Sequence, residues 1–248
     1  MKKFFIIAFL LNSISLFPQR QMEQMPSLIA HGGGELDSVN TTNAWEAIIY
    51  SIDKYKYIEI DLLLTSDSFL VAAHDWSYFN ELTNRFELGD SVLSLREFEN
   101  QRILGKYKPT TYLDIQGLLR DNTDWILVTD KFDDAVLLDR YFGEFKDRML
   151  VEAFSIEAFN ELKAAGFIPM YSDGPLDKIL LYSIENMMKD GEPIDFITDF
   201  YSIDFDSMRR TKCLMPFRVS VYTSDSDSYV NEHLGDDVDL IYTNTLKP

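Results

Sequence analysis

The chain has 248 residues, 46% of them apolar, so it can bury a substantial core as one large domain or two small ones. Its 41 acidic and 23 basic residues give a formal net charge of −18, which argues against nucleic acid or an anionic membrane surface as a partner. A phosphate held locally by a metal remains compatible with that charge. The single cysteine, Cys213, excludes an intrachain disulfide and a thiolate metal cluster.

The first residues have the pattern of an export signal. A short positive Met-Lys-Lys opening precedes fourteen mostly apolar residues, 4–17. This stretch is short for a membrane span and suits the apolar region of a signal peptide. We therefore expect a signal peptide over 1–20 and an exported, periplasmic or secreted domain over 27–248 that keeps no membrane span. The alternative is an N-terminal packing segment of a cytoplasmic protein.

From residue 27 onward, apolar runs typical of strands alternate with segments of helical spacing. Residues 76–110 interrupt this alternation, and their irregular pattern of aromatic and polar groups predicts an inserted loop or lid. The expected strands are 28–33, 57–63 (extended by 68–73), 124–131, 148–154, 167–172, 195–200, 217–223 and 239–244. The expected helices are 42–55, 110–122, 134–145, 155–166, 178–191, 202–213 and 227–235.

Strands that alternate with helices in this way predict an α/β fold. Eight strands of this kind indicate a (β/α)8 TIM barrel in a single domain, with an open doubly wound sheet as the alternative. In a barrel, functional side chains lie at the carboxyl ends of the strands. The candidate residues discussed below follow or end such strands.

An acidic pair lies on the second expected strand. Glu59 and Asp61 alternate with apolar residues, so both carboxylates point to the same face of the strand. Two buried acids side by side are costly unless a cation offsets their charge. His31 and His74 follow apolar runs on either side of this pair. Two imidazoles near a carboxylate-bound metal can act as base and acid on a phosphate ester.

In order along the chain, these motifs resemble the glycerophosphodiester phosphodiesterase family, whose pattern is HRG, N-T/S-x-x-A, E-x-D, T-x-D-G-x-x-V and HD. The likeness covers most of 28–246 and is densest over 29–75. KPTTYLDIQGLL, VYTSD and LIYTN resemble the later segments of the family. The matching positions are His31-Gly32-Gly33, Asn43, Ala47, Glu59-Ile60-Asp61, the TSDSFLV hairpin and His74-Asp75.

The resemblance implies a barrel that hydrolyses a small-molecule phosphodiester with Mg²⁺ or Ca²⁺. It makes Glu59 and Asp61 metal ligands, and His31 and His74 the acid–base pair. The chemistry of the side chains agrees. Carboxylate oxygens suit hard divalent cations, and histidine titrates near neutral pH.

The chain departs from the family pattern after its first histidine. The family has arginine at this position, whereas the chain has Gly32. The phosphate contact of that arginine is therefore lost or replaced, and the backbone N–H groups of Gly32 and Gly33 are the candidates to replace it.

A second departure concerns the third metal carboxylate, which the family supplies in an E-x-K segment. The chain has Thr129-Asp130-Lys131 there. Alignment on the lysine selects Thr129, and alignment on the acid selects Asp130. We choose Asp130, because related spider-venom-type phospholipase D enzymes also use aspartate, and keep Glu152 as the reserve. Lys131 is the remaining cation for the phosphate.

Two further functions compete with phosphodiester hydrolysis. One is a phospholipase D-like or cyclising lyase reaction on lysophospholipids, and the other is a barrel that binds a phosphorylated ligand without turnover. Each residue also has a structural alternative: an ion-pair network for Glu59 and Asp61, a turn for His31, a helix cap for His74-Asp75. The sequence leaves the alcohol, the metal and the oligomeric state open.

Overall fold

The computed structural model describes residues 27–172, 194–199 and 217–248. The expected signal peptide over 1–20, Cys213 and the expected helices over 178–191 and 202–213 lie outside these residues. Among the described helices, none is long and apolar enough to cross a membrane.

The described strands follow the predicted ones closely, with ends that differ by at most three residues. Residues 68–73, predicted as an extension of the second strand, contribute β3, which pairs with β2 in an antiparallel hairpin. The strands are β1 (Ser27–Ala30), β2 (Tyr57–Leu64), β3 (Leu70–Ala72), β4 (Ile126–Asp130), β5 (Met149–Ala153), β6 (Ile168–Ser172), β7 (Ile194–Asp199), β8 (Phe217–Tyr222) and β9 (Leu240–Thr243).

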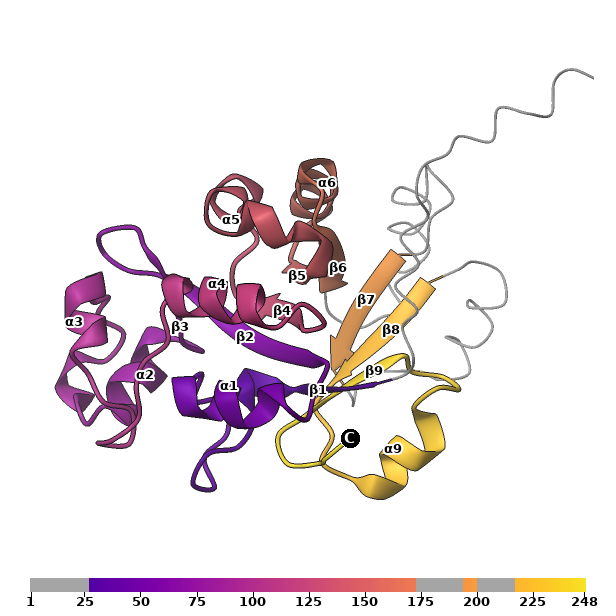
Figure 1. Ribbon diagram of the computed structural model, residues 1–248, viewed down its shortest axis with the longest axis horizontal. Helices are drawn as coiled ribbons and strands as arrows, with labels where there is room; N and C mark the ends of the chain where they lie inside the picture. Colours follow the sequence, from indigo (N-terminus) through magenta and orange to yellow (C-terminus); the bar gives the residue numbers. More distant parts are fainter. Residues whose placement is uncertain (1–26, 173–193, 200–216) are drawn as a thin grey trace, which may run out of the picture.

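Apart from β3, the described strands form one curled parallel sheet (Figure 1). Their order is β1-β9-β8-β7-β6-β5-β4-β2, and β1 also pairs with β2. An open sheet would leave β1 with a free edge, whereas β1 pairs on both sides. The predicted α/β fold is therefore confirmed, and the structure shows a curled parallel sheet. The complete (β/α)8 barrel is not tested, because the connections after β6 and β7 lie outside the described residues.

The two faces of the curled sheet bury different side chains. On β2, Ile58 and Ile60 point outward and belong to the main core between the sheet and its helices. Tyr57 points inward, where it packs with Val128 and Leu150 of the neighbouring strands. Glu59 and Asp61 continue this inward series toward the carboxyl end of β2. The strand period of two therefore carries the acidic pair to the inside of the sheet.

Polar side chains cap the first turn of most described helices. Ser155 caps α6 by accepting a hydrogen bond from the Ala158 N–H, and Gly166 ends the helix with a left-handed φ of +91°. The described α-helices are α1 (Trp45–Ile52), α2 (Trp76–Leu82), α3 (Leu95–Glu99), α4 (Tyr112–Asp121), α5 (Ala135–Phe142), α6 (Ile156–Ala165) and α9 (Asp227–His233). The segment η3 (Gly143–Arg148) joins α5 to β5.

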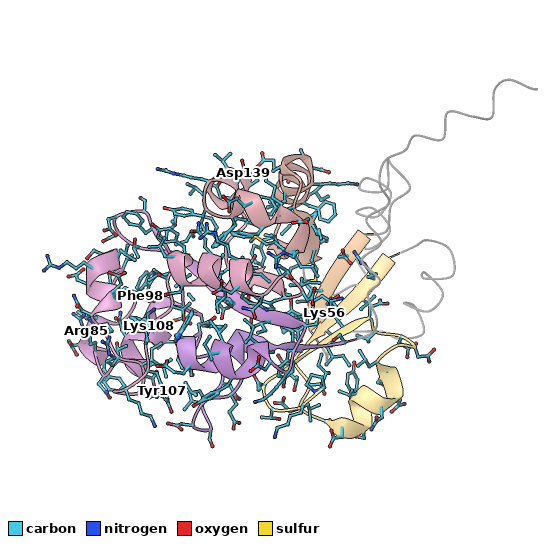
Figure 2. All side chains as sticks on the ribbon, in the orientation of Figure 1. Lys56, Arg85, Phe98, Tyr107, Lys108 and Asp139 are labelled. Carbon is cyan, nitrogen blue, oxygen red and sulfur yellow. The ribbon has the colours of Figure 1, made fainter. Side chains whose placement is uncertain are left out.

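Residues 76–110, which we expected to be irregular, form the short helices α2 and α3 and the 3-10 turn η2 (Phe86–Leu88). Phe79 and Phe98 stack with ring centroids 4.4 Å apart and anchor a second core cluster. Figure 2 shows Phe98 and Tyr107 at the end of the molecule where α2 and α3 lie, away from β7 and β8. The aromatic residues that made the sequence of this segment look irregular therefore form its core.

Candidate active site

A cavity of about 330 Å³ lies at the carboxyl ends of the parallel strands. Its wall combines acids, two histidines, one lysine and aromatic rings. The lining residues are His31, Glu59, His74, Asp130, Lys131, Glu152, Phe154, Ser172, Tyr222 and Tyr242. Residues from seven parallel strands, or from the turns that follow them, therefore meet at one place, as expected of a barrel-like sheet.

Three carboxylates meet beside this cavity. Glu59, Asp61 and Asp130 each offer an oxygen atom, and these atoms lie within 4.8 Å of one another. Asp61 and Asp130 are direct neighbours in the register of β2 and β4. Thr129, the alternative to Asp130, lies one residue earlier and so faces the opposite side of the sheet. The described residues contain no other group of three such ligands.

Glu59 carries one carboxylate oxygen without a hydrogen-bond partner among the described residues. Its Oε2 accepts from the Gly32 N–H at 2.6 Å, whereas Oε1 is buried and unpaired. Burial and the nearby charges of Asp61 and Asp130 raise the pKa of Glu59 well above its usual value. A buried, unpaired carboxylate oxygen next to two further carboxylates fits a hard divalent cation such as Mg²⁺ or Ca²⁺.

Asp61 is held in place by Asn43. The Asn43 Nδ2 donates to Asp61 Oδ2 at 2.7 Å, and the Asp61 N–H donates to Asn43 Oδ1 at 3.0 Å. Burial raises the pKa of Asp61 to about 6, although the hydrogen bond from Asn43 opposes this rise. Asn43 has a left-handed φ of +52°, so this loop conformation aims its amide at the acid. The sequence motif included Asn43, but its role was not predicted.

Lys131 turns back toward the acids because its backbone leaves the strand conformation. Adjacent residues on a strand face opposite sides, so Asp130 and Lys131 would not normally share the cavity. A φ of +69° at Lys131 ends the strand, and its Nζ lies 2.8 Å from Asp130 Oδ2. Burial, the largest single influence, opposes the charge of Lys131. The hydrogen bond to Asp130 and the negative charges around it together outweigh burial and raise the pKa of the lysine.

The hydrogen-bond partners of His31 assign a tautomer to its ring. Its Nδ1 lies 3.0 Å from Asn244 Oδ1. The Asn244 Nδ2 donates to Asp225 Oδ2 at 3.0 Å, and this fixes the amide with its oxygen toward the histidine. His31 Nδ1 therefore carries the proton, which leaves Nε2 as a proton acceptor. Burial lowers the pKa of His31, so the neutral form persists to lower pH.

Asp225 organises the turn after β9 that presents Asn244. Its Oδ1 accepts from the Asn244 and Thr245 N–H groups and from the Thr243 hydroxyl, at 2.7, 3.1 and 2.7 Å. These contacts join the turn after β8 to the end of β9. Sequence reasoning missed Asp225 and Asn244, although both fall in the closing segments that resemble the family.

His74 has a different partner. Its Nδ1 lies 2.8 Å from Asp75 Oδ2, and Asp75 Oδ1 accepts from the Tyr78 N–H at the start of α2. The carboxylate of Asp75 therefore caps a helix and pairs with His74 at the same time. Asp75 thus caps α2, as the structural alternative expected, and His74 also lines the cavity.

The turn after β1 explains why glycine follows His31. Gly32 has a φ of +54°, and a Cβ there would lie 2.3 Å from Thr41 Cα. An arginine in this backbone conformation would collide with the loop that carries Asn43. The Gly32 N–H donates to Glu59, and the Gly34 N–H donates to the His31 carbonyl at 2.8 Å. The amide of Gly32 thus supports an acid rather than pointing at a phosphate.

Glu152 lines the cavity but lies outside the group of three acids. It is 4% exposed, and its Oε1 accepts from the Tyr242 hydroxyl at 2.9 Å. Burial, followed by the charge of Asp130, raises its pKa well above the usual value. The structure thus brings together His31, His74, Glu59, Asp130 and Lys131 and leaves the reserve ligand Glu152 on the adjoining wall, next to β6.

No family model matches the sequence, and no curated protein matches it. Solved structures give a clearer result. An Oleispira antarctica phosphodiesterase in complex with the product sn-glycerol-3-phosphate has a TM-score of 0.70 and 16% identity, over 89% of this chain and 93% of that chain. A glycerophosphodiester phosphodiesterase from Agrobacterium tumefaciens has a TM-score of 0.66 and 16% identity, over 89% and 95%.

A third structure, a glycerophosphodiester phosphodiesterase from Thermotoga maritima, has a TM-score of 0.62 and 18% identity, over 88% of this chain and 93% of that chain. At identities this low, the TM-scores establish similarity of fold and nothing more. The sequence motifs and the fold are separate observations, and both indicate the same family. The chain therefore has the fold of the glycerophosphodiester phosphodiesterases, at low sequence identity.

Proposed function

We propose that the chain is a metal-dependent phosphodiesterase that cleaves a glycerophosphodiester or a related head-group phosphodiester on a (β/α)8 barrel. Glu59, Asp61 and Asp130 hold the divalent cation, Mg²⁺ or Ca²⁺. When bound, the cation supplies positive charge that offsets the charge developing on the phosphate. The observation that carries the proposal is the pair of differently partnered histidines on one cavity wall beside three clustered acids.

The partners of the two histidines assign their roles. His31 has its proton fixed on Nδ1 by Asn244, so Nε2 takes the proton from the attacking hydroxyl, which belongs to water or to the substrate. The contact of His74 Nδ1 with Asp75 leaves the Nε2–H of His74 to give a proton to the leaving alkoxide. Lys131 provides the cation for the phosphate oxygens, together with the backbone N–H of Gly33.

The two alternative functions differ in which residues of the site they require. A phospholipase D-like or cyclising reaction uses the same acids and histidines, so the phosphorus product decides between it and hydrolysis. A barrel that only binds a phosphorylated ligand does not need two oriented histidines. The partners of His31 and His74 therefore favour turnover.

The test is release of alcohol from a panel of glycerophosphodiesters and lysophospholipids with Mg²⁺, Ca²⁺ or EDTA. We expect metal-dependent turnover that falls by at least about a hundredfold in His31→Ala and in Glu59→Gln. Glu144→Gln, which changes an exposed acid of η3, is the matched control and keeps full activity. ³¹P NMR then separates a monoester from a cyclic product. Turnover that is unaffected by EDTA or by His31→Ala contradicts the proposal.

A further inference from the structure

Lys131 contacts both oxygens of the Asp130 carboxylate. Its backbone N–H donates to Asp130 Oδ1 at 2.5 Å, and its Nζ lies 2.8 Å from Asp130 Oδ2. Among the described residues that line the cavity, Lys131 is the only lysine or arginine. Asp130 is also the third member of the acidic group that fits a divalent cation. This lysine therefore holds an oxygen atom of a proposed metal ligand.

The backbone brings the lysine to the acid, and the side chain is free to leave it. The left-handed φ of +69° turns the Lys131 side chain to the cavity face, whereas a regular strand would point it away. The Asp130 side chain is 19% exposed and that of Lys131 is 36% exposed. Lysine carries its ammonium on a flexible four-carbon stem, so this group can move to another partner while the shorter aspartate stays in place.

A divalent cation and the Lys131 ammonium compete for Asp130. A bound Mg²⁺ or Ca²⁺ lies in direct contact with its ligand oxygens. If both shared Asp130 Oδ2, two positive charges would lie only a few ångströms apart in a partly buried site, where their repulsion is strong. Binding through Oδ1 changes little, because both oxygens belong to one small carboxylate. A cation at Asp130 therefore requires the ammonium to leave.

We propose that Lys131 is an exchangeable counter-ion of Asp130: the cation displaces its ammonium, which then turns to the phosphate group of the substrate. This inference rests on the proposed function and deepens it. It makes the binding of cation and phosphate cooperative, because each favours the arrangement in which the ammonium has left Asp130. By linkage, the cation tightens phosphate binding by the same factor by which phosphate tightens cation binding.

The exchange gives the charge of Lys131 opposite effects on the protein with and without a cation. Without a cation, the ammonium offsets the charge of Asp130 and stabilises the fold. When a cation binds, the same ammonium must first be displaced, so it weakens cation binding. A lysine with a purely structural role would instead stabilise both forms of the protein.

Calorimetry with Mg²⁺ or Ca²⁺ alone tests the competition without any turnover. Lys131→Met removes the ammonium and keeps an unbranched side chain, so we expect it to bind the cation about tenfold more tightly than the wild type. In EDTA its Tm falls by about 2–4 °C, and Mg²⁺ raises its Tm by more than that of the wild type. Lys54→Met, which removes an exposed lysine, is the matched control and changes neither property.

Two further measurements separate the exchange from repulsion at a distance. In EDTA, Lys131→Met lowers the Tm much less in an Asp130→Asn background, because the carboxylate that pairs with the ammonium is absent. Calorimetry with sn-glycerol 3-phosphate then measures the cooperativity. Mg²⁺ tightens its binding to the wild type by about tenfold or more. The tightening is smaller in Lys131→Met, where only the direct attraction between cation and phosphate remains.

Three results overturn the exchange. They are cation binding that is unchanged or weaker in Lys131→Met, an equal fall in Tm in the Asp130→Asn background, and an equal effect of Mg²⁺ on sn-glycerol 3-phosphate binding in both proteins. These measurements also separate the exchange from the proposed function. If they give the expected values but no phosphodiester turns over, the proposed function fails and the exchange stands. If substrates turn over but Lys131→Met binds the cation as the wild type does, only the exchange fails.

Discussion

At the scale of single residues, Gly32 shows how a departure from a family pattern can be a requirement of the backbone. Its φ is +54°, and a Cβ at this position would lie only 2.3 Å from Thr41 Cα, so there is no room for a side chain. The same turn gives its N–H to Glu59. The conformation of this turn therefore explains why glycine replaces the family's arginine. It also explains how the backbone supports Glu59, a proposed metal ligand.

We predict that Gly32→Ala lowers the free energy of unfolding by about 2 kcal/mol or more, because the methyl group collides with backbone and the left-handed φ is strained. The corresponding fall in Tm is about 4–8 °C for a chain of this size. Gly117→Ala is the control: no atom lies within 4 Å of its Cβ, and it is inside α4. An equal Tm in both variants would refute the steric argument.

Asn244 is the second informative residue, because it sets the proton position of His31. Its hydrogen bond raises the pKa of His31 against the larger lowering by burial. Asn244→Ala therefore lowers that pKa further, and the acidic limb of the kcat/KM profile moves to lower pH, since His31 must be neutral to act as base. The maximal rate falls by about tenfold as the ring loses its orientation. A fall in rate without movement of the acidic limb would assign Asn244 a purely structural role.

At the scale of elements, the start of α2 joins helix capping to the site. Asp75 accepts from the Tyr78 N–H through one oxygen and contacts His74 through the other. The helix therefore fixes the position of the carboxylate that faces the histidine. A substitution that keeps the cap but removes the charge separates the two roles.

We predict that Asp75→Asn keeps the Tm within about 2 °C, because asparagine caps helices as well as aspartate does. Its kcat falls by about tenfold, because the amide does not hold the His74 ring as the carboxylate does. Asp75→Ala loses both the helix cap and the carboxylate that contacts His74, so its free energy of unfolding also falls by about 1 kcal/mol. If Asp75→Asn retained full kcat, His74 would not depend on the charge of Asp75.

The elements also show what the sequence determines. The period of two placed Glu59 and Asp61 on one face, and the apolar runs placed the described strands within three residues. Two kinds of feature escaped prediction. Lys131 shares the cavity with Asp130 only through a left-handed φ, which no periodicity encodes. Asp225 and Asn244 reach His31 through contacts between strands far apart in sequence, and local patterns contain no signal for such contacts.

At the scale of the whole molecule, the acidic site links stability to metal and pH. Burial raises the pKa of Glu59 and brings that of Asp61 to about 6. Raised carboxyl pKa values contribute stability below the unfolded values near 4, and this stability is lost as pH rises through the folded values. Without metal, the site therefore weakens the native state most at neutral and alkaline pH.

We predict that Mg²⁺ or Ca²⁺ at about one hundred times its Kd adds about 2.7 kcal/mol, which raises Tm by about 5–10 °C. The increase is larger at pH 8 than at pH 5, where protons compete for the carboxylates. Thermal unfolding with metal and with EDTA measures it, and Glu59→Gln removes most of the gain. A metal-induced increase of the same size at both pH values, or in Glu59→Gln, would show that the cation binds elsewhere.

The pairing of β1 with both β2 and β9 has a consequence for the order of folding. His31 follows the first described strand, and Asn244, which orients it, follows the last, so the contact spans 213 residues. Local helices and hairpins form before contacts of such long range. The proposed base therefore gains its working tautomer in one of the last steps of folding. Recovery of activity then reports completion of the fold, whereas a helix signal reports only its early stages.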